Sequence, residues 1–448
     1  MSSEKPLAVI ILAAGVGSRM KSNTPKVLHK ITGLSMVGHV VKTAQSLGAE
    51  KIITVVGPDM QSVSDAVSPN PCVIQKQRNG TGDAVKVALD EIKEFAGDVL
   101  VLYGDVPMVS EQTLQALVEH HGNGGFGATI LAMAPPDPTG YGRILQNQDG
   151  SLKAIIEQAD ASDDEKQIRL VNSGLMVIDG ANLSKWISRI ESNNAQGEYY
   201  LTDLPKIIQD DDGVCGVIRG DYLELRGVNT RAQLAELEEY AQTVLRHTAM
   251  DRGVTLLDPK TVHLSWDTEI GQDVVIGQNV VLGPGVAIEQ DAEILPFSHI
   301  EGATIKRGAS VGPYARIRPK SVIGEGASVG NFIEVNRSTL QSGVKAKHVS
   351  YLGDSDIGEK SNIGAGTVIA NYDGQNKQDT SIGKNVFVGS NTTIVAPVKV
   401  SDGAIIGAGS VVTNDIPKDA LALARAELTI KDGHAVQYRD KIAKKKTA

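Results

Sequence analysis

The chain has 448 residues and a mass of 47.4 kDa, enough for about two to four domains. Hydrophobic residues make up 41% of the sequence and charged residues 22%, which excludes a disordered or fibrous protein. The net charge of −9 has the wrong sign for a general nucleic-acid binder, so we expect no nucleic-acid partner and only a local phosphate site.

The cysteines and the start of the chain predict a cytoplasmic protein. Cys72 and Cys215 lie far apart in sequence, which argues against a zinc cluster or a disulfide framework and is typical of a reducing compartment. The first residues lack a long apolar segment, and the apolar run from Leu7 to Gly15 is too short to span a bilayer. We therefore expect no membrane partner.

Residues 1–229 predict an α/β domain, because short apolar runs alternate there with helical patterns. The runs 7–12, 51–56, 98–103 and 128–132 each have the length and composition of a buried strand. Such alternation favours a Rossmann-like domain, with a mostly parallel sheet and helices on both faces.

The first of these runs leads directly into a glycine-rich loop, Leu12-Ala13-Ala14-Gly15-Val16-Gly17-Ser18-Arg19-Met20, and Lys26 follows soon after. Glycines let backbone N–H groups approach a phosphate, and Arg19 and Lys26 add positive charge. The loop is not a dinucleotide fingerprint, because Met20 replaces the third glycine, and it lacks the Gly-Lys-Ser/Thr of a Walker A loop. A bare Gly-x-Gly is more often an ordinary turn, but the whole string resembles the signature loop of sugar-phosphate nucleotidyltransferases.

A candidate metal ligand, Asp105, follows the apolar run 98–103. An acid at the carboxyl end of a sheet strand can hold Mg²⁺, which prefers oxygen ligands. Alone, Asp105 would more often be a turn or cap residue. Because triphosphates and Mg²⁺ occur together, the nearby glycine-rich loop favours the metal site.

Residues 230–252 predict a long linking helix. Leu234, Leu237 and Ala241 recur at helical spacing. Thr230 and Gln233 form a capping box before them, and Gly253 is a plausible stop.

Residues 253–448 carry an aliphatic residue at every sixth position. The series is Leu264, Ile270, Ile276, Leu282, Ile288, Ile294 and Ile300, then, after one skipped residue, Ile305, Val311, Ile317, Ile323, Val329 and Val335, and later Ile357, Ile363, Ile369, Ile382, Val388, Ile394, Val400, Ile406 and Val412. The next residue is often Gly, and the fourth after it is usually small. A coil that turns every six residues points one aliphatic side chain inward per step, so the pattern predicts a hexapeptide parallel β-helix. Two interruptions, 337–351 and 372–381, are expected to be loops that leave this scaffold and carry sites.

The N-terminal motifs, by their order and spacing, resemble one enzyme family. They are Leu12 to Gly15, Lys26, Gln75, Gly80 to Gly82, Tyr103 to Asp105, Gly140 to Arg143, Glu157, Asn172 to Gly174, Asn194 to Tyr200 and Gly227 to Asn229. Over nearly its full length the chain resembles the bacterial bifunctional glucosamine-1-phosphate N-acetyltransferases and N-acetylglucosamine-1-phosphate uridyltransferases. The resemblance implies a left-handed β-helix, a homotrimer, and synthesis of UDP-N-acetylglucosamine, the precursor of peptidoglycan and, in some organisms, lipopolysaccharide.

The resemblance also implies a site for UTP, N-acetylglucosamine-1-phosphate and Mg²⁺ in the N-terminal domain. Arg19 and Lys26 would be catalytic, and Asp105 with Asn229 would bind the metal. The implied substrate-binding residues are Leu12, Ala13, Ala14, Gly15, Lys26, Gln75, Gly80, Thr81, Tyr103, Gly104, Asp105, Gly142, Glu157, Asn172 and Asn229. Of these, Gln75, Gly80 and Thr81 would read the uracil, and Gly142, Glu157 and Asn172 would hold the sugar. Without the family, Glu157 and Asn172 would be interpreted as solvated loop residues and Asn229 as a helix cap.

For the β-helix the resemblance implies acetyl transfer from acetyl-CoA to glucosamine-1-phosphate, with His348 as the base. A lone His in a polar loop is more often a solvated surface residue, so this role depends on the family pattern. The implied substrate-binding residues are Arg318, Asn336, Tyr351, Asn362, Asn371, Tyr372, Ser390, Ala408 and Arg425. The sequence departs from the family at Asn336, where Lys is usual, and Arg337 either replaces that ammonium or does not. We expect acetyl transfer to persist; a weaker hold on the acceptor phosphate would be the consequence of the lost ammonium.

Two alternatives remain open at this stage. One is a monofunctional sugar-1-phosphate nucleotidyltransferase with a structural β-helix, which thiol release from acetyl-CoA would exclude. The other is a non-catalytic scaffold or sugar-nucleotide-binding protein, which turnover of UTP to pyrophosphate would exclude.

Overall fold

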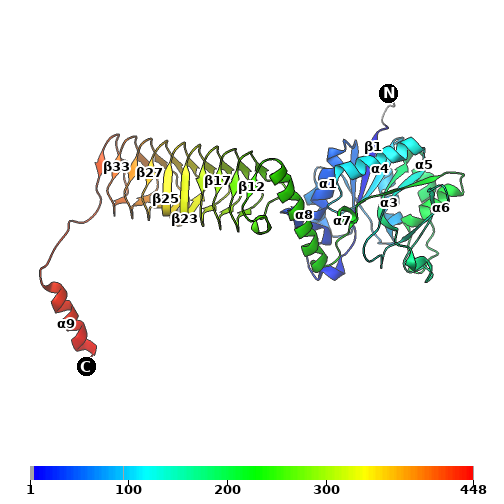
Figure 1. The fold of residues 1–448 in the computed structure, drawn as a ribbon, viewed down its shortest axis with the longest axis horizontal. Helices are drawn as coiled ribbons and strands as arrows, with labels where there is room; N and C mark the ends of the chain where they lie inside the picture. The colour runs from blue at the N-terminus through cyan, green and yellow to red at the C-terminus, as the bar shows by residue number, and fades with distance from the viewer. Residues whose placement is uncertain (1–4, 94, 447–448) are drawn as a thin grey trace. The chain divides into compact units, whose positions relative to one another are not determined.

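The computed structural model describes residues 5–93 and 95–446, with the side chains of 445 and 446 left out. The chain forms two compact units, Met1–Val244 and Leu245–Ala448 (Figure 1). The division falls inside helix α8 (Arg231–Asp251). No helix in the described part of the chain has the length and apolarity that a bilayer crossing needs.

The first unit is built on a sheet whose central order is β11 (Cys215–Arg219), β7 (Ala128–Met133), β10 (Val171–Asp179), β6 (Asp98–Tyr103), β1 (Leu7–Leu12), β4 (Lys51–Val56) and β5 (Cys72–Ile74). The strands β8 (Arg143–Gln146) and β9 (Leu152–Ile156) extend it as an antiparallel pair beside β10. All four strands predicted from apolar runs are present. The sheet is mixed, because β10 runs antiparallel between β6 and β7.

Both faces of this sheet are covered, as the continuous apolar runs predict. Along β1, Ala8, Ile10 and Leu12 pack into one core and Leu7, Val9 and Ile11 into another, since alternate side chains of a strand point to opposite faces. The helices of this unit are α1 (Met36–Ser46), α2 (Gln61–Val67), α3 (Thr81–Ala88), α4 (Glu111–Gly124), α5 (Gly180–Ile187), α6 (Leu204–Gln209) and α7 (Tyr222–Leu225), with 3-10 turns at Ser18–Met20, Lys26–Leu28, Leu89–Ile92, Glu165–Gln167 and Leu201–Asp203. A two-stranded sheet, β2 (Lys30–Ile31) with β3 (Leu34–Ser35), follows the second of these turns.

Helix α8 begins and ends as the sequence predicts. The Gln233 backbone N–H donates to Thr230 Oγ1 (3.2 Å), and the Thr230 N–H donates to Gln233 Oε1 (3.1 Å), which is a reciprocal capping box. Gly253, with φ of +89°, follows the end of the helix, and a left-handed conformation there suits glycine.

The second unit is a parallel β-helix. Its strands are β12 (Thr255–Leu256), β13 (Glu269–Ile270), β14 (Val275–Ile276), β15 (Val281–Leu282), β16 (Ala287–Ile288), β17 (Glu293–Ile294), β18 (His299–Ile300), β19 (Thr304–Ile305), β20 (Ser310–Val311), β21 (Arg316–Ile317), β22 (Val322–Ile323), β23 (Ser328–Asn336), β24 (Thr339–Leu340), β25 (Lys345–Gly353), β26 (Ser355–Ile357), β27 (Asn362–Ile363), β28 (Val368–Ala370), β29 (Thr380–Ile382), β30 (Phe387–Val388), β31 (Thr393–Val395), β32 (Val398–Val400), β33 (Ile405–Ile406), β34 (Val411–Val412) and β35 (Leu421–Ala422). A 3-10 turn (Pro259–Thr261) follows β12, and an exposed helix, α9 (His434–Lys446), follows β35. Successive coils lie side by side (Figure 1).

The register between coils explains the period of six. Ile270 pairs with Ile288, Ile288 with Ile305, and Ile305 with Ile323, so each coil consists of three hexapeptides. The skipped residue of the sequence pattern falls in the coil between Ile288 and Ile305, which is one residue shorter than its neighbours. Nearly every member of the aliphatic series lies in one continuous buried core, with Ile270 packed against it.

One expectation about the scaffold is wrong. Residues 337–351 do not leave the β-helix as a loop, because they contain β24 and most of β25, and Leu340, Val344 and Ala346 are fully buried in its core. The coil continues there, but its buried residues no longer fall on the six-residue series, so the sequence pattern is lost although the core packing continues. In the second interruption, residues 372–379 lie outside the named strands, closed by an isolated bridge between Tyr372 and Lys377, and β29 begins at Thr380.

Candidate active sites

A cavity of about 270 Å³ lies at the carboxyl edge of the first unit's sheet. It brings together the loop after β1, the segment after β5 and the end of β6, as expected where parallel strands end at one edge. Its lining includes ten of the residues predicted from sequence, namely Leu12, Ala13, Ala14, Gly15, Lys26, Gln75, Gly80, Thr81, Tyr103 and Asp105. Space is open beside Gly15, where an added Cβ would meet nothing within 4 Å.

Lys26 connects the two predicted metal ligands. Its ammonium donates to Asp105 Oδ2 and, at 3.1 Å, to Asn229 Oδ1. A carboxylate oxygen and an amide oxygen therefore face one cation, and both are groups that Mg²⁺ prefers. Gly17 lies directly against this lysine, and a Cβ at Gly17 would clash with it, 2.5 Å from Lys26 Cβ.

Gln75, predicted to read the base, has a fixed amide. Gln75 is 3% exposed, and its Nε2 donates to Gly80 O (3.0 Å) and to Asp83 Oδ2 (2.8 Å). With Nε2 committed, Gln75 presents Oε1 as an acceptor for an N–H of a planar base.

The predicted sugar-binding residues Gly142, Glu157 and Asn172 lie close to one another. The Asn172 N–H donates to Gly142 O (2.9 Å), and a Cβ at Gly142 would lie 3.4 Å from the Glu157 carboxylate. Glu157 accepts a hydrogen bond from Thr202 Oγ1 (2.9 Å), and burial raises the pKa of its carboxyl. Burial, with the negative charges of Glu157 and Asp105, also raises the pKa of Tyr103.

Six predicted residues are not among those that line the cavity, namely Arg19, Gly104, Gly142, Glu157, Asn172 and Asn229, and the structure adds others. Of these six, Arg19 is exposed. Arg78 and Glu198 do line the cavity, and Arg78 Nε donates to Ala14 O at 2.6 Å. The position of Arg78, two residues before Gly80-Thr81-Gly82, was the available sequence signal for it.

In the β-helix, His348 is exposed on β25 and borders a cavity of about 230 Å³. The other lining residues are Ser310, Gly312, Pro313, Ser328, Val329, Gly330, Asn331 and Lys347. Asn331 on β23 pairs in register with His348. The histidine therefore has open space beside it rather than packed core.

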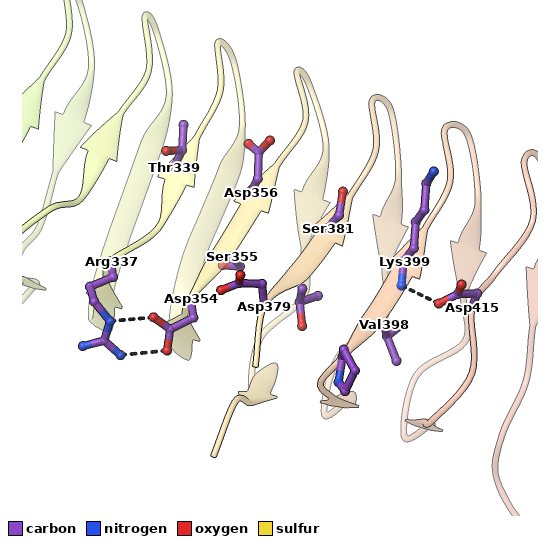
Figure 2. Close-up of a pocket in the computed structure, with 12 residues that line it drawn as sticks. Arg337, Thr339, Asp354, Ser355, Asp356, Asp379, Ser381, Val398, Lys399 and Asp415 are labelled. Carbon is purple, nitrogen blue, oxygen red and sulfur yellow. Dashed lines mark hydrogen bonds and ion pairs between the residues drawn. The ribbon is translucent and has the colours of Figure 1, made fainter. Parts of the chain in front are cut away.

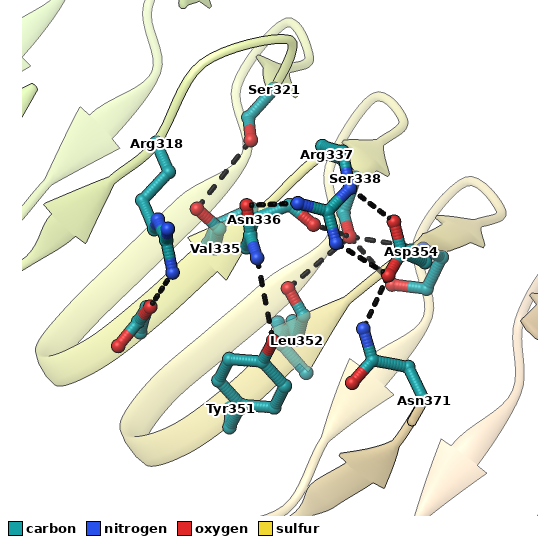
Figure 3. A network of polar contacts seen from close by, with 12 residues as sticks. Arg318, Ser321, Val335, Asn336, Arg337, Ser338, Tyr351, Leu352, Asp354 and Asn371 are labelled. Carbon is teal, nitrogen blue, oxygen red and sulfur yellow. Dashed lines mark hydrogen bonds and ion pairs between the residues drawn. The ribbon is translucent and has the colours of Figure 1, made fainter. Parts of the chain in front are cut away.

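Three of the predicted acetyltransferase residues lie in one polar network (Figure 3). Asn336 Nδ2 lies 3.4 Å from the Tyr351 hydroxyl, and Asn371 Nδ2 donates to Asp354 Oδ2. Arg337 donates from Nε (2.5 Å) and Nη2 (2.7 Å) to Asp354 and from Nη1 (3.2 Å) to Asn336 Oδ1. The guanidinium is thus paired with a carboxylate rather than free. Arg318 is likewise paired, with Glu334 at 2.9 Å.

A larger, open cavity of about 730 Å³ lies beside the same ion pair (Figure 2). Its charged lining consists of Arg337, Lys399, Asp354, Asp356, Asp379 and Asp415. Four carboxylates against two cations do not suit a sugar phosphate, so this cavity is a poorer candidate than the one beside His348.

The remaining predicted residues are spread over later coils. Asn362 lies on β27, Tyr372 in the exposed loop, and Ser390 after β30. Arg425 donates to Ala408 O at 2.8 Å. None of them lines the cavity beside His348. Among the described residues there is also no cluster of three or more His, Cys, Asp or Glu side chains suited to a metal ion.

Comparisons with known proteins match both units. Residues 9–167 match the MobA-like NTP transferase domain, residues 299–373 match the GMPPB C-terminal domain, and residues 268–294 and 379–414 match the hexapeptide repeat of succinyl-transferase. These matches agree with the mixed α/β sheet and with the coils of the β-helix.

Full-length relatives are more specific. The chain is 48% identical to the bifunctional protein GlmU of Paramagnetospirillum magneticum, covering 100% of this chain and 99% of the relative. It is 46% identical to that of Paracoccus denitrificans, over 99% of both chains, and 42% identical to that of Zymomonas mobilis, over 99% and 100%. Full-length similarity decides against the monofunctional enzyme and the non-catalytic scaffold. The protein therefore belongs to the GlmU family, the bifunctional uridylyltransferases and acetyltransferases of UDP-N-acetylglucosamine synthesis.

Proposed function

We propose that the cavity after β1 and β6 carries the uridylyl transfer of this enzyme and that the β-helix around His348 carries its acetyl transfer. The corresponding domains are residues 1–229 and 253–448, with 230–252 as the linking helix. The observation that carries the first assignment is the convergence of Lys26, Asp105, Gln75 and Thr81, from distant parts of the sequence, on one cavity. The second assignment is supported by the open space beside His348.

In the uridylyl step, a phosphate oxygen of N-acetylglucosamine-1-phosphate attacks the α-phosphorus of UTP, and pyrophosphate leaves. Gln75 Oε1 and the backbone at Gly80 and Thr81 would position the uracil. The Lys26 ammonium would stabilise negative charge on the phosphates. Catalysis here consists mainly of positioning and electrostatic stabilisation.

Mg²⁺ fits the residues present, because Asp105 and Asn229 already direct two oxygens toward one cation, the Lys26 ammonium. Both would hold the metal, as proposed from the sequence. When bound, Mg²⁺ neutralises charge on the triphosphate. Lys26 would then turn from these oxygens toward phosphate.

In the acetyl step, His348 would take a proton from the amine of glucosamine-1-phosphate. The amine nitrogen then attacks the thioester carbonyl of acetyl-CoA, and the CoA thiolate leaves and is protonated. Arg318, Asn336 and Tyr351 are proposed to hold the sugar phosphate, with Asn362. Asn371, Tyr372, Ser390, Ala408 and Arg425 are proposed to contact the acceptor or acetyl-CoA.

A homotrimer in the cytoplasm completes the proposal. Later coils carry proposed acetyl-CoA contacts that do not reach the His348 cavity within one chain, and the segment after β35 exposes Leu428 (86%) and Ile430 (75%). A neighbouring copy would supply the missing contacts and cover these apolar side chains. The enzyme supplies the UDP-sugar precursor for peptidoglycan.

The decisive experiment is mass analysis of the products formed from glucosamine-1-phosphate, UTP and Mg²⁺, with and without acetyl-CoA. We expect UDP-N-acetylglucosamine only when acetyl-CoA is present. Uridylation of supplied N-acetylglucosamine-1-phosphate without any consumption of acetyl-CoA would contradict the acetyltransferase assignment.

A further inference from the structure

A continuous chain of side-chain contacts runs through the proposed acceptor site. It leads from Asn371 through Asp354, Arg337 and Asn336 to Tyr351 (Figure 3). The two central members, Asp354 and Arg337, were not among the site residues predicted from sequence. Asp354 is 9% exposed, Asn371 6% and Asn336 3%, so these three side chains are largely shielded from water, whereas the Arg337 side chain is 28% exposed.

The charged members determine the direction of every hydrogen bond in the chain. An ionised carboxylate only accepts and a guanidinium only donates. Asp354 therefore accepts from Arg337 Nε and Nη2 and from Asn371 Nδ2. Hydrogen bonding to the Arg337 guanidinium holds the pKa of Asp354 below its usual range, so the carboxylate stays ionised at neutral pH.

The same logic fixes the two amides. Arg337 Nη1 donates at 3.2 Å, so Asn336 must present Oδ1 to it, and Asn336 Nδ2 then faces the Tyr351 hydroxyl at 3.4 Å. An amide N–H only donates, so the Tyr351 oxygen accepts and its own hydrogen points away from the chain. Among the described residues no acceptor takes this hydrogen.

The two ends of the chain come close together. A Cβ added at Gly353 would lie 2.7 Å from Asn371 Nδ2 and 2.7 Å from the Tyr351 hydroxyl. The glycine leaves room for both side chains. One end of the chain offers an O–H donor at Tyr351, and the other offers the Asn371 Oδ1 acceptor.

We propose that Asp354 and Arg337 are positioning residues that set the hydrogen-bond polarity of the acceptor site, so that Tyr351 donates to the phosphate of glucosamine-1-phosphate. The inference rests on the proposed acetyltransferase site. It gives the Asn336 departure a physical meaning: an amide oriented by an ion pair stands where the family usually has an ammonium, and the tyrosine hydroxyl carries the contact to phosphate.

The test uses the full-length chain and steady-state acetyl transfer. Tyr351→Phe removes the donor, and Asp354→Asn removes the charge that fixes the chain. Each is expected to raise the KM for glucosamine-1-phosphate about tenfold, the loss of one good hydrogen bond, with the KM for acetyl-CoA changed less than about twofold. The double variant is expected to match the single variants, because Asp354 acts through Tyr351.

Arg337→Lys covers the case in which Asp354→Asn does not fold. Lysine keeps the charge beside Asp354 but cannot donate to both Asp354 and Asn336 from a planar fork, so it should also raise the KM for glucosamine-1-phosphate. The matched control is Glu289→Gln, which breaks an exposed ion pair with Lys306 (2.7 Å) on an earlier coil and should leave both KM values unchanged.

The outcomes separate the two claims. If Tyr351→Phe raises the KM for glucosamine-1-phosphate while Asp354→Asn and Arg337→Lys do not, or if the Tyr351 and Asp354 effects multiply in the double variant, the positioning role is wrong. If Tyr351→Phe itself leaves that KM unchanged, the acceptor binds elsewhere, and the proposed acetyltransferase site fails with the inference.

Discussion

Lys26 and Asp105 are 79 positions apart in sequence, yet the Lys26 ammonium donates directly to the Asp105 carboxylate. The pair is mostly buried, with side-chain exposures of 13% and 17%. Both residues line the cavity that lies at the loop after β1 and the end of β6. Asn229, two residues before the start of α8, also accepts a hydrogen bond from the Lys26 ammonium.

Removal of Asp105 should therefore abolish uridylyl transfer. In Asp105→Ala the cavity loses the proposed metal ligand and Lys26 loses its partner, so we expect at least about a 100-fold fall in UDP-sugar formation. Acetyl transfer should be unchanged. Asp65→Ala, on an exposed face of α2, is the control. Full uridylyl transfer in Asp105→Ala would remove Asp105 from the site.

We expect a side chain at Gly17 to lower uridylyl transfer as well as stability, because it would displace Lys26. Its φ of +67° is left-handed, and a Cβ there would lie 2.5 Å from Lys26 Cβ. Gly17→Ala should cost about 1 kcal/mol of stability from its backbone and should also displace Lys26, reducing uridylyl transfer about tenfold or more.

Gly125→Ala is the matched control for this change. Gly125 has a similar φ of +58°, but a Cβ there would meet nothing within 4 Å. We expect the same loss in urea unfolding and no loss of activity. Equal activity in the two variants would show that Gly17 does not position Lys26.

His348→Ala should lower acetyl transfer by about 10²–10⁴-fold, the usual contribution of a general base. Uridylation of supplied N-acetylglucosamine-1-phosphate should stay at the level of the unmodified enzyme. His299→Ala, exposed on β18 of the same β-helix, should leave both activities intact. The proposal for the base is wrong if the two histidine variants release thiol from acetyl-CoA at the same rate.

Glu157 should make a pH-dependent contribution to stability. Because burial raises its pKa in the folded state above the ordinary value of 4.5, the folded chain binds this proton more tightly than the unfolded chain. The cost of the buried charge is therefore fully present above the folded pKa and disappears as pH falls through the folded pKa toward 4.5.

Glu157→Gln carries no charge at any pH and should remove this dependence. We expect its urea midpoint to be at least that of the unmodified protein at pH 7.5, with the advantage shrinking at pH 5, and the KM for N-acetylglucosamine-1-phosphate to rise about tenfold. Glu50→Gln, an exposed carboxylate, is the control. A difference in midpoint that does not change with pH would contradict the assignment of a buried charge.

Light scattering on the purified chain checks the proposed assembly. We expect a mass three times the chain mass of 47.4 kDa. A stable monomer with full acetyl transfer would contradict the requirement for a neighbouring copy.

The sequence by itself determined the features that depend on short-range patterns. The aliphatic period of six predicted the β-helix because each hexapeptide places one side chain in the core, independently of distant residues. Thr230 and Gln233 predicted the start of α8 because a capping box lies within one helical turn. The glycine-rich loop and its lysine were visible for the same reason, since they lie within 15 residues of one another.

Only the tertiary structure decided which distant residues meet. No repeating pattern in the sequence indicates three of these contacts. They are the antiparallel placement of β10, the contact of Lys26 with Asn229, and the pairing of Arg337 with Asp354 one coil later. The segment 337–351 looked like a loop because its phase shifts, although its core packing continues. Hydrogen bonds and ion pairs depend on where the folded backbone places each side chain, and that placement follows from strand order and register rather than from local spacing.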